Sequence, residues 1–195
     1  MRARIAVSIG ESIRVKQLVL ADEKLLMQLE HLALDCIKAL RAGGKIIFAG
    51  NGGSFADAQH LSAEFTSRFL VDRAPLPSLA LGTNSSAMSA IGNDYGYEQV
   101  FGRELRGIAQ PEDVFIGIST SGNSANILNA VEVANNLGIR SVVWTGQTGG
   151  KLVGRCECMQ VPATDTARIQ ECHILLGHIL CGLIETDYFQ IDHSV

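Results

Sequence analysis

The chain has 195 residues, with 16 Lys plus Arg against 20 Asp plus Glu and a formal net charge of −4. This length fits one domain with a substantial core. A mildly acidic chain without a basic cluster argues against a nucleic-acid ligand, and no apolar run reaches the length that spans a bilayer. Polar residues interrupt the apolar residues of the N-terminal segment, which argues against a secretory signal, so we expect a cytoplasmic protein.

The five cysteines are odd in number and lie mostly in apolar helical patterns. We therefore expect buried free thiols rather than a disulfide framework. The spacing of Cys156 and Cys158 does not match that of a zinc knuckle.

Apolar residues at three- and four-residue spacing predict two helices within residues 4–41. Asp22 is a suitable N-cap for the second helix, and Gly43 and Gly44 end it. This helical pair has more apolar surface than one face of a sheet needs. We therefore expect residues 1–42 to form a helical extension that packs against another subunit.

Short apolar runs then alternate with amphipathic stretches along the rest of the chain. The runs expected to form strands are residues 45–49, 78–81, 114–118, 141–144 and 158–161. Residues 92–96, Gly-Asn-Asp-Tyr-Gly, are interpreted as a turn, and Asp165 or Thr166 as the cap of a last long helix. The alternation predicts an α/β fold for residues 1–195, a three-layer sandwich in which helices flank a central parallel sheet.

The first strand leads into the loop Gly50-Asn51-Gly52-Gly53-Ser54 and then into a helix. Backbone N–H groups in such a loop, together with a helix N-terminus, favour a phosphate. No lysine follows the glycines, which excludes an ATP-binding P-loop. Phe55 occupies the position where a dinucleotide fingerprint needs its third glycine. A monophosphate is the ligand that remains.

A second polar loop, Ser119-Thr120-Ser121-Gly122-Asn123-Ser124, also joins a buried strand to a helix. Both loops lie at the carboxyl ends of parallel strands, where ligands bind in open α/β sheets. One such loop is readily explained as an ordinary Ser/Thr helix cap. Two loops with five hydroxyls between them favour a site that holds a phosphate without a cationic side chain.

Several histidines are candidates for chemistry. His60 and Glu64 are four residues apart and share a helix face. Gln170 and His178 are about 80° apart around the last helix, so both can face one site, whereas His173 need not face it. The residues alone would make His178 a core histidine in an apolar run; His31 and His193 are interpreted as surface residues.

Together these motifs resemble the sugar isomerase (SIS) domain, and most closely its phosphoheptose isomerases. The resemblance rests on Gly-Asn-Gly-Gly-Ser with the following Ala-Asp-Ala-Gln-His, on Ser-Thr-Ser-Gly-Asn-Ser, on Ile91-Gly-Asn-Asp-Tyr-Gly96 and on Ala167-Arg-Ile-Gln-Glu171. It covers nearly the whole chain. Asn84 stands where the family often has an aspartate, so an acidic role is not expected there.

The resemblance implies an aldose–ketose isomerase that converts sedoheptulose 7-phosphate to D-glycero-D-manno-heptose 7-phosphate through an enediol, in the biosynthesis of ADP-heptose for lipopolysaccharide. It implies Glu64 and His178 as catalytic base and acid, Zn²⁺ on His60, Glu64, Gln170 and His178, and a homotetramer. The substrate-binding residues that it implies are Asn51, Gly52, Gly53, Ser54, Glu64, Asn93, Asp94, Ser119, Thr120, Ser121, Ser124 and Gln170.

Two alternatives stay open. One is a non-catalytic SIS protein that binds a replication initiator, although such relatives lack the glutamate and the histidine that this chain has at Glu64 and His178. The other is an isomerase of a different sugar phosphate, because phosphate loops recognise only the phosphate end of a substrate.

Overall fold

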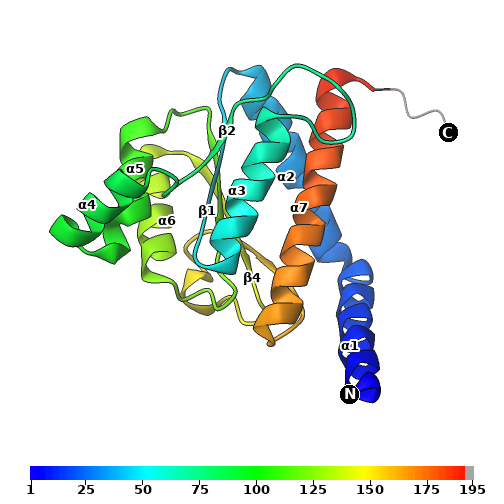
Figure 1. Cartoon of the computed structure of the whole chain (residues 1–195). Coiled ribbons are helices and arrows are strands. Elements are labelled where there is room, and N and C mark those ends of the chain that lie inside the picture. Colours follow the sequence, from blue (N-terminus) through cyan, green and yellow to red (C-terminus); the bar gives the residue numbers. More distant parts are fainter. Residues whose placement is uncertain (192–195) are drawn as a thin grey trace.

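The computed structural model describes residues 1–191, in which helices cover both faces of one central sheet (Figure 1). The expectation for His193 falls outside the described residues. The strands are β1 (Ile46–Gly50), β2 (Ser78–Ala80), β3 (Val114–Ile118), β4 (Arg140–Thr145) and β5 (Glu157–Gln160). The α-helices are α1 (Arg2–Leu20), α2 (Glu23–Arg41), α3 (Gly53–Thr66), α4 (Ser85–Tyr95), α5 (Val100–Ile108), α6 (Ala125–Leu137) and α7 (Thr166–Phe189), and two 3₁₀ turns are η1 (Tyr97–Gln99) and η2 (Gly150–Leu152). The predicted α/β sandwich is confirmed.

The sheet has the strand order β2-β1-β3-β4-β5, and every neighbouring pair is parallel. β1 pairs with β3 from Ile46↔Val114 to Gly50↔Ile118, so these two strands end side by side. The chain leaves β1 toward β2 on one side and later returns to β3 on the other. Because the direction of winding reverses between β1 and β3, the loops after these strands flank a crevice suited to a ligand.

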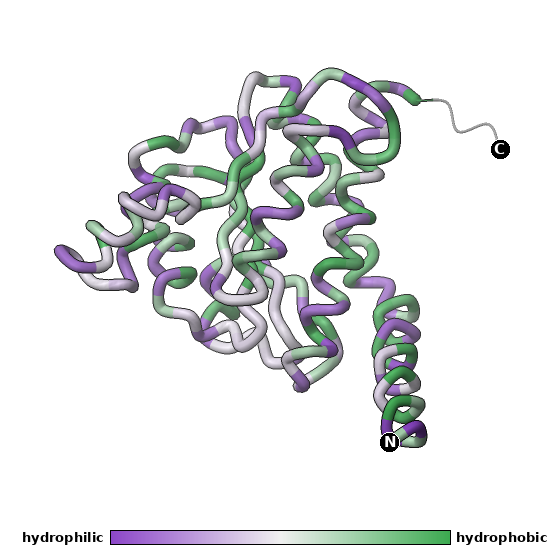
Figure 2. Tube along the Cα trace, in the orientation of Figure 1, coloured by the Kyte–Doolittle hydropathy of each residue, from purple (hydrophilic) through white to green (hydrophobic). Residues whose placement is uncertain are grey.

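Alternate residues of each central strand point to opposite faces of the sheet and build two separate cores. Ile46 and Phe48 pack with α2, α3 and α7, whereas Ile47 packs with α5 and α6. β3 and β4 continue the same alternation, and both strands are buried almost throughout. Figure 2 shows the apolar strands at the centre of the molecule, between the two helical layers. Strands buried on both faces explain the continuous apolar runs of the sequence.

α1 projects from the body of the molecule (Figure 1). Val15 and Val19 are buried, but Ile5, Val7 and Ile9 are more than half exposed. This helix packs mainly against α2 and α7. Among residues 1–191, no helix combines the length and the apolarity needed to cross a membrane.

Two predicted helix starts are confirmed. The carboxylate of Asp22 accepts a hydrogen bond from the backbone N–H of Leu25, and that of Asp165 accepts one from the backbone N–H of Arg168, each over 3.0 Å. A side-chain oxygen at this position satisfies one of the first N–H groups of the helix, which have no partner inside the helix.

The prediction of a turn over residues 92–96 is wrong. Gly92 through Tyr95 lie inside α4, and only Gly96, with φ +91°, leaves the helix. The Asn84 side chain caps the start of α4 by accepting the N–H of Ala87, and Met88 and Ile91 pack on the second core. Capping and packing therefore override the weak helix propensity of the Gly-Asn-Asp segment.

All five cysteines are free thiols, as the sequence predicts. Cys36, Cys172 and Cys181 are buried, whereas Cys156 and Cys158 are partly exposed. Burial raises the pKa of Cys36 and of Cys181, so both thiols stay protonated at neutral pH.

Candidate active site

The loop after β1 brings its backbone close to the last helix. Gly52 adopts φ +57°, a conformation in which glycine is strain-free, and precedes the first turn of α3. A side chain at Gly53 would meet the amide of Gln170, because a Cβ there would lie 2.6 Å from Gln170 Nε2. The Gln170 amide therefore lies directly against the loop, and glycine is the residue that fits at position 53.

Asn51 is held in place by an amide network that joins this loop to α6. Its side-chain amide exchanges two hydrogen bonds with that of Asn126, over 2.8 and 2.9 Å, and accepts a third from the Tyr97 hydroxyl over 3.1 Å. Asn126 is buried. Since Tyr97 closely follows α4, the network also ties the end of α4 to the glycine loop.

The loop after β3 is preorganised by its own side chains. The hydroxyls of Ser119 and Ser124 lie 2.9 Å apart, and the Ser121 hydroxyl accepts the N–H of Asn123 over 3.2 Å. Gly122 adopts φ +66° and packs so closely that a Cβ would lie 2.0 Å from the carbonyl oxygen of Gly149. The hydroxyls are therefore carried by a tightly packed turn next to the β1 loop.

A histidine–glutamate–histidine cluster joins α3 and α7. His60 Nε2 lies 3.2 Å from Glu64 Oε1 and 3.0 Å from His178 Nε2. The ligand atoms of the three residues all lie within 4.8 Å of one another. His60 and Glu64 meet because four residues advance a helix by about one turn. His178 meets them because α3 and α7 pack together.

The environment of the cluster is half open. Glu64 and His178 are partly buried, whereas His60 is exposed. The ring of Phe69 stacks over that of His178, with centroids 5.7 Å apart and an interplanar angle of 24°. A ligand can therefore reach His60, while Phe69 shields one face of His178.

These residues fit a divalent metal ion of the zinc type. Two imidazoles and a carboxylate are a donor set that zinc uses in catalytic sites, where a further position stays open for water or substrate. Donor atoms at about 2.1 Å from an ion in tetrahedral geometry lie roughly 3.4 Å apart, close to the 3.0 and 3.2 Å separations seen here. His60 and Glu64 on one helix and His178 on another could hold such an ion.

Other predicted site residues lie outside this cluster. Gln170 is beside Gly53, and His178 is eight residues further on, about 12 Å along the helix axis. Asn93 and Asp94 are exposed on α4, where the Asn93 amide donates to the Asp94 carboxylate over 2.8 Å. The cluster within one chain thus contains three of the four expected metal ligands.

The structure adds Asp57, which is not among the residues that the sequence motifs predict. It lies on α3 three residues before His60 and seven before Glu64, so all three occupy one helical face. Its Oδ2 is buried and has no hydrogen-bond partner within residues 1–191. Burial raises the pKa of Asp57, against the opposing effect of His60 and His178. The i, i+3, i+7 spacing would have identified this carboxylate from the sequence.

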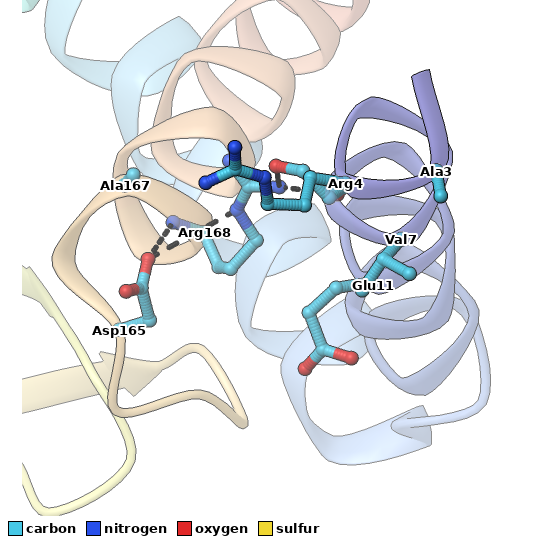
Figure 3. Close-up of a pocket in the computed structure, with 8 residues that line it drawn as sticks. Ala3, Arg4, Val7, Glu11, Asp165, Ala167 and Arg168 are labelled. Carbon is cyan, nitrogen blue, oxygen red and sulfur yellow. Dashed lines mark hydrogen bonds and ion pairs between the residues drawn. The ribbon is translucent and has the colours of Figure 1, made fainter. Parts of the chain in front are cut away.

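Two cavities are relevant to the choice of site. The larger, about 540 Å³, lies between α1 and the start of α7, and Figure 3 shows Arg4 and Arg168 within its lining. Among the described residues, those that line it include no histidine. A smaller cavity of about 240 Å³ adjoins the serine loop, and its polar lining residues are Thr120, Ser121, Asn123, Gln147, Thr148 and Thr164. The described lining of the larger cavity thus lacks the paired histidines, so chemistry identifies the site better than volume does.

Comparisons with known proteins point to one family. The family model of the SIS domain matches residues 14–146. A phosphoheptose isomerase from Aneurinibacillus thermoaerophilus is 53% identical over 183 residues, which cover 93% of this chain and 92% of that protein. Phosphoheptose isomerase 2 from Campylobacter jejuni is 49% identical over 92% of this chain and 90% of its own length.

A solved structure shows the same relationship. The structure of a phosphoheptose isomerase from Neisseria gonorrhoeae matches with a TM-score of 0.88 at 41% identity, and the match covers 95% of this chain and 98% of that one. The agreement extends over almost the full length of both chains.

Proposed function

The chain belongs to the SIS domain family and, within it, to the phosphoheptose isomerases, and we propose that it isomerises sedoheptulose 7-phosphate at the cluster of His60, Glu64 and His178. The product is the corresponding aldose, D-glycero-D-manno-heptose 7-phosphate, for the biosynthesis of ADP-heptose. The observation that carries this proposal is the convergence of the three side chains from α3 and α7.

The reaction moves a carbonyl group between two neighbouring carbons of the sugar. We propose that Glu64 removes the proton from the carbon next to the carbonyl and that His178 serves the oxygen as acid. The resulting enediol receives the proton from Glu64 on the carbon that first carried the carbonyl. His178, which gave its proton to the first oxygen, takes the proton of the neighbouring hydroxyl, so the carbonyl ends on the neighbouring carbon. A carboxylate base working with a histidine is an established solution to this chemistry.

The phosphate end of the substrate is assigned to the two loops. Ser54, Ser119, Thr120, Ser121 and Ser124 supply hydroxyls, and Gly52 and Gly53 supply backbone N–H groups at the start of α3, where the helix dipole favours an anion. His60 follows Gly53 by seven residues, about 10 Å along the helix. A substrate that bridges this separation has its carbonyl far from its phosphate, as a seven-carbon sugar 7-phosphate does.

The remaining contacts are assigned to polar groups around the glycine loop. Asn51, fixed by Asn126 and Tyr97, and Gln170, beside Gly53, are positioned to bind sugar hydroxyls. We assign Asn93 and Asp94 the same role, which their place on α4 near the Tyr97 contact supports. These contacts would orient the chain of the sugar without taking part in proton transfer.

We propose that His60, Glu64 and His178 hold Zn²⁺, with Gln170 as the fourth ligand named by the family resemblance. Gln170 lies beside Gly53 in this chain, so it would have to move, or to come from another copy, to reach the same ion. When bound, the ion supplies a Lewis acid that polarises a substrate oxygen. Glu64 would then be a weaker base, because a metal-bound carboxylate loses basicity.

The decisive experiment assays the isomerisation of sedoheptulose 7-phosphate by NMR for the intact protein and for Glu64→Gln. We expect the variant to lose at least about a thousandfold in turnover, since the amide of glutamine cannot accept the proton. Glu132→Gln, the same change on the exposed side of α6, is the matched control and should retain full activity. Unchanged turnover in Glu64→Gln would refute the assignment.

The same assay separates the alternatives. A panel that includes a hexulose 6-phosphate and arabinose 5-phosphate tests for another sugar specificity, and activity on one of these with none on sedoheptulose 7-phosphate would replace the proposed substrate. Inactivity on the whole panel would favour a non-catalytic SIS protein. Dialysis against a chelator, with zinc content measured per chain, tests the metal: we expect about one ion per chain in the intact protein and a lower content in His178→Ala.

A further inference from the structure

A buried ion pair holds the segment that follows α3. The side chains of Arg73 and Glu185 are 4% and 2% exposed, and Arg73 Nε lies 2.8 Å from Glu185 Oε1. Removing two charges from water is costly unless their remaining donors and acceptors are also satisfied. The further partners of the two side chains therefore indicate what the pair does.

Arg73 binds the carboxyl end of α3. Its Nη2 donates to the backbone carbonyl of Glu64 over 2.7 Å, and its Nη1 donates to the carbonyls of Phe65 and Ser67 over 2.7 and 3.2 Å. The last carbonyls of a helix have no N–H partner inside the helix, and a cation there is favourable. Arg73 is therefore the cap of the turn that carries Glu64.

Glu185 binds the loop on the other side of the pair. Its carboxylate accepts the backbone N–H groups of Phe69, Leu70 and Val71 over 3.0, 2.7 and 3.3 Å. Burial opposes ionisation of Glu185, but the N–H groups of Leu70 and Phe69 and the Arg73 guanidinium outweigh it and hold the pKa of this carboxyl below its usual value. Glu185 is therefore an anion that fixes the loop through its backbone.

The contacts of Arg73 and those of Glu185 both reach the candidate active site. Arg73 fixes the backbone of Glu64, and Glu185 fixes Phe69, whose ring stacks on His178. We propose that Arg73 and Glu185 are positioning residues for the isomerase, a role that rests on the function proposed for Glu64 and His178. Neither side chain touches the reacting atoms. Together they hold the last turn of α3 and the ring over His178 in one geometry.

The expected size of the effect follows from the precision that proton transfer requires. A displacement of about 1 Å at a catalytic group can cost about a hundredfold in rate. The last turn of a helix frays readily without a cap, and Glu64 lies in that turn. Loss of the cap should therefore lower kcat more than it changes KM, because the loops that hold the phosphate stay intact.

The chain supplies a matched control in a second buried ion pair. Lys45 Nζ lies 2.6 Å from Asp113 Oδ2, with side chains 18% and 0% exposed. Asp113 also accepts the backbone N–H groups of Lys45 and Gln110. This pair lies before β1 and β3, at the edge of the sheet opposite to the loops after those strands. Its loss should destabilise the fold without reaching the active site.

The experiment compares Arg73→Lys and Glu185→Gln with Asp113→Asn. Lysine keeps the charge but lacks the planar fork that reaches several carbonyls. We expect each of the first two variants to lose about tenfold to a hundredfold in kcat, to change KM by no more than about threefold, and to bind Zn²⁺ about tenfold more weakly in competition with a chelator. Asp113→Asn should lower Tm to a similar extent while kcat and Zn²⁺ affinity stay unchanged.

Glu64→Gln, measured beside these variants, distinguishes a failure of the proposed active site from a failure of the positioning role alone. If Glu64→Gln retains turnover, the proposed site itself is wrong. If Glu64→Gln is inactive while Arg73→Lys and Glu185→Gln keep the kcat and Zn²⁺ affinity of Asp113→Asn, only the positioning role is overturned. If both variants fail to fold, Phe69→Leu removes the ring over His178 without a buried charge, and unchanged kcat and Zn²⁺ affinity in that variant would also overturn it.

Discussion

Two histidines five residues apart on α7 have opposite environments. His178 is partly exposed between His60 and Phe69, whereas His173 is fully buried beside Trp144, and its Nε2 lies 3.2 Å from the carbonyl oxygen of Thr145. Five residues turn a helix by about 140°, so one side chain faces α3 while the other enters the core. The first is suited to chemistry and the second to packing.

The buried histidine predicts a pH dependence of stability. Burial lowers the pKa of His173 to about 4 from a usual value of 6.5, against a smaller opposing effect of the Thr145 carbonyl. Between these two values the unfolded chain binds a proton that the folded chain does not, so the free energy of unfolding falls as the pH falls from 6.5 to 4. The full contribution is about 3 kcal/mol.

Chemical denaturation at several pH values checks this expectation. His173→Gln keeps a side-chain amide that can donate to Thr145 but does not titrate, so its unfolding free energy should change less over this range than that of the unsubstituted protein. The difference between the two curves isolates His173 from the carboxyl groups that also titrate there. Parallel curves would contradict the prediction.

Glycine at position 122 is required by space as well as by backbone conformation. Gly122 and Gly138 have nearly the same φ, +66° and +70°, but only Gly122 packs against backbone atoms, those of Gly149 and Gly150. An alanine at Gly138 should cost about 1 kcal/mol of stability. An alanine at Gly122 should cost at least about twice that and should also raise KM, because the serine loop must shift. Equal effects of the two variants on Tm and KM would show that the close approach is unimportant.

Individual elements are specified by local signals to different degrees. α2 has a capping aspartate, a regular apolar stripe and glycines after its end, and it lies where those signals place it. α4 has a cap but an apparent turn sequence at its end, and packing on the second core decides its length. Local signals therefore specify where a helix begins better than where it ends.

The cap of α2 predicts a measurable loss of stability. Asp22→Ala removes the acceptor for the N–H of Leu25 and should lower the unfolding free energy by about 1 kcal/mol. Glu30→Ala, on the exposed face of the same helix, is the control and should change it by less than about 0.5 kcal/mol. Thermal denaturation of both variants measures the difference, and a Tm for Asp22→Ala equal to that of the control would contradict the role of the cap.

In the molecule as a whole, α1 is the element whose exposed apolar residues are not explained by contacts within one chain. Ile5, Val7 and Ile9 are exposed on a helix that extends away from the sheet (Figure 1), whereas the apolar residues of the two cores are covered by neighbouring layers. We propose that residues 1–42 join subunits into a homotetramer, in line with the expectation from the sequence. Exposed apolar surface of this kind is typical of an interface.

The mass of the protein in solution tests this proposal. We expect the unsubstituted chain to sediment at about four times its 20.9 kDa. Val7→Lys places a charge on the exposed apolar surface of α1 and should shift the mass toward smaller species. Val153→Lys, at an exposed apolar residue between β4 and β5, should leave it unchanged. A monomeric unsubstituted protein would refute the proposed role of α1.

Local signals in the sequence were enough to specify most of the elements and part of the candidate site. The apolar runs predict the five strands, the two polar loops follow the strands that end side by side, and the four-residue spacing places His60 with Glu64. Periodicity assigns residues to the faces of one element. Periodicity therefore predicts that His60 and Glu64 are neighbours, but it does not place His178 beside them.

Long-range packing determined which faces of the helices and of the sheet meet. The packing of α3 on α7 brought His178 to His60, and the packing of the segment after α3 on α7 formed the pair of Arg73 and Glu185. These contacts join residues up to 118 positions apart. No local pattern encodes such contacts, because they depend on how buried surfaces fit together once the sheet has formed.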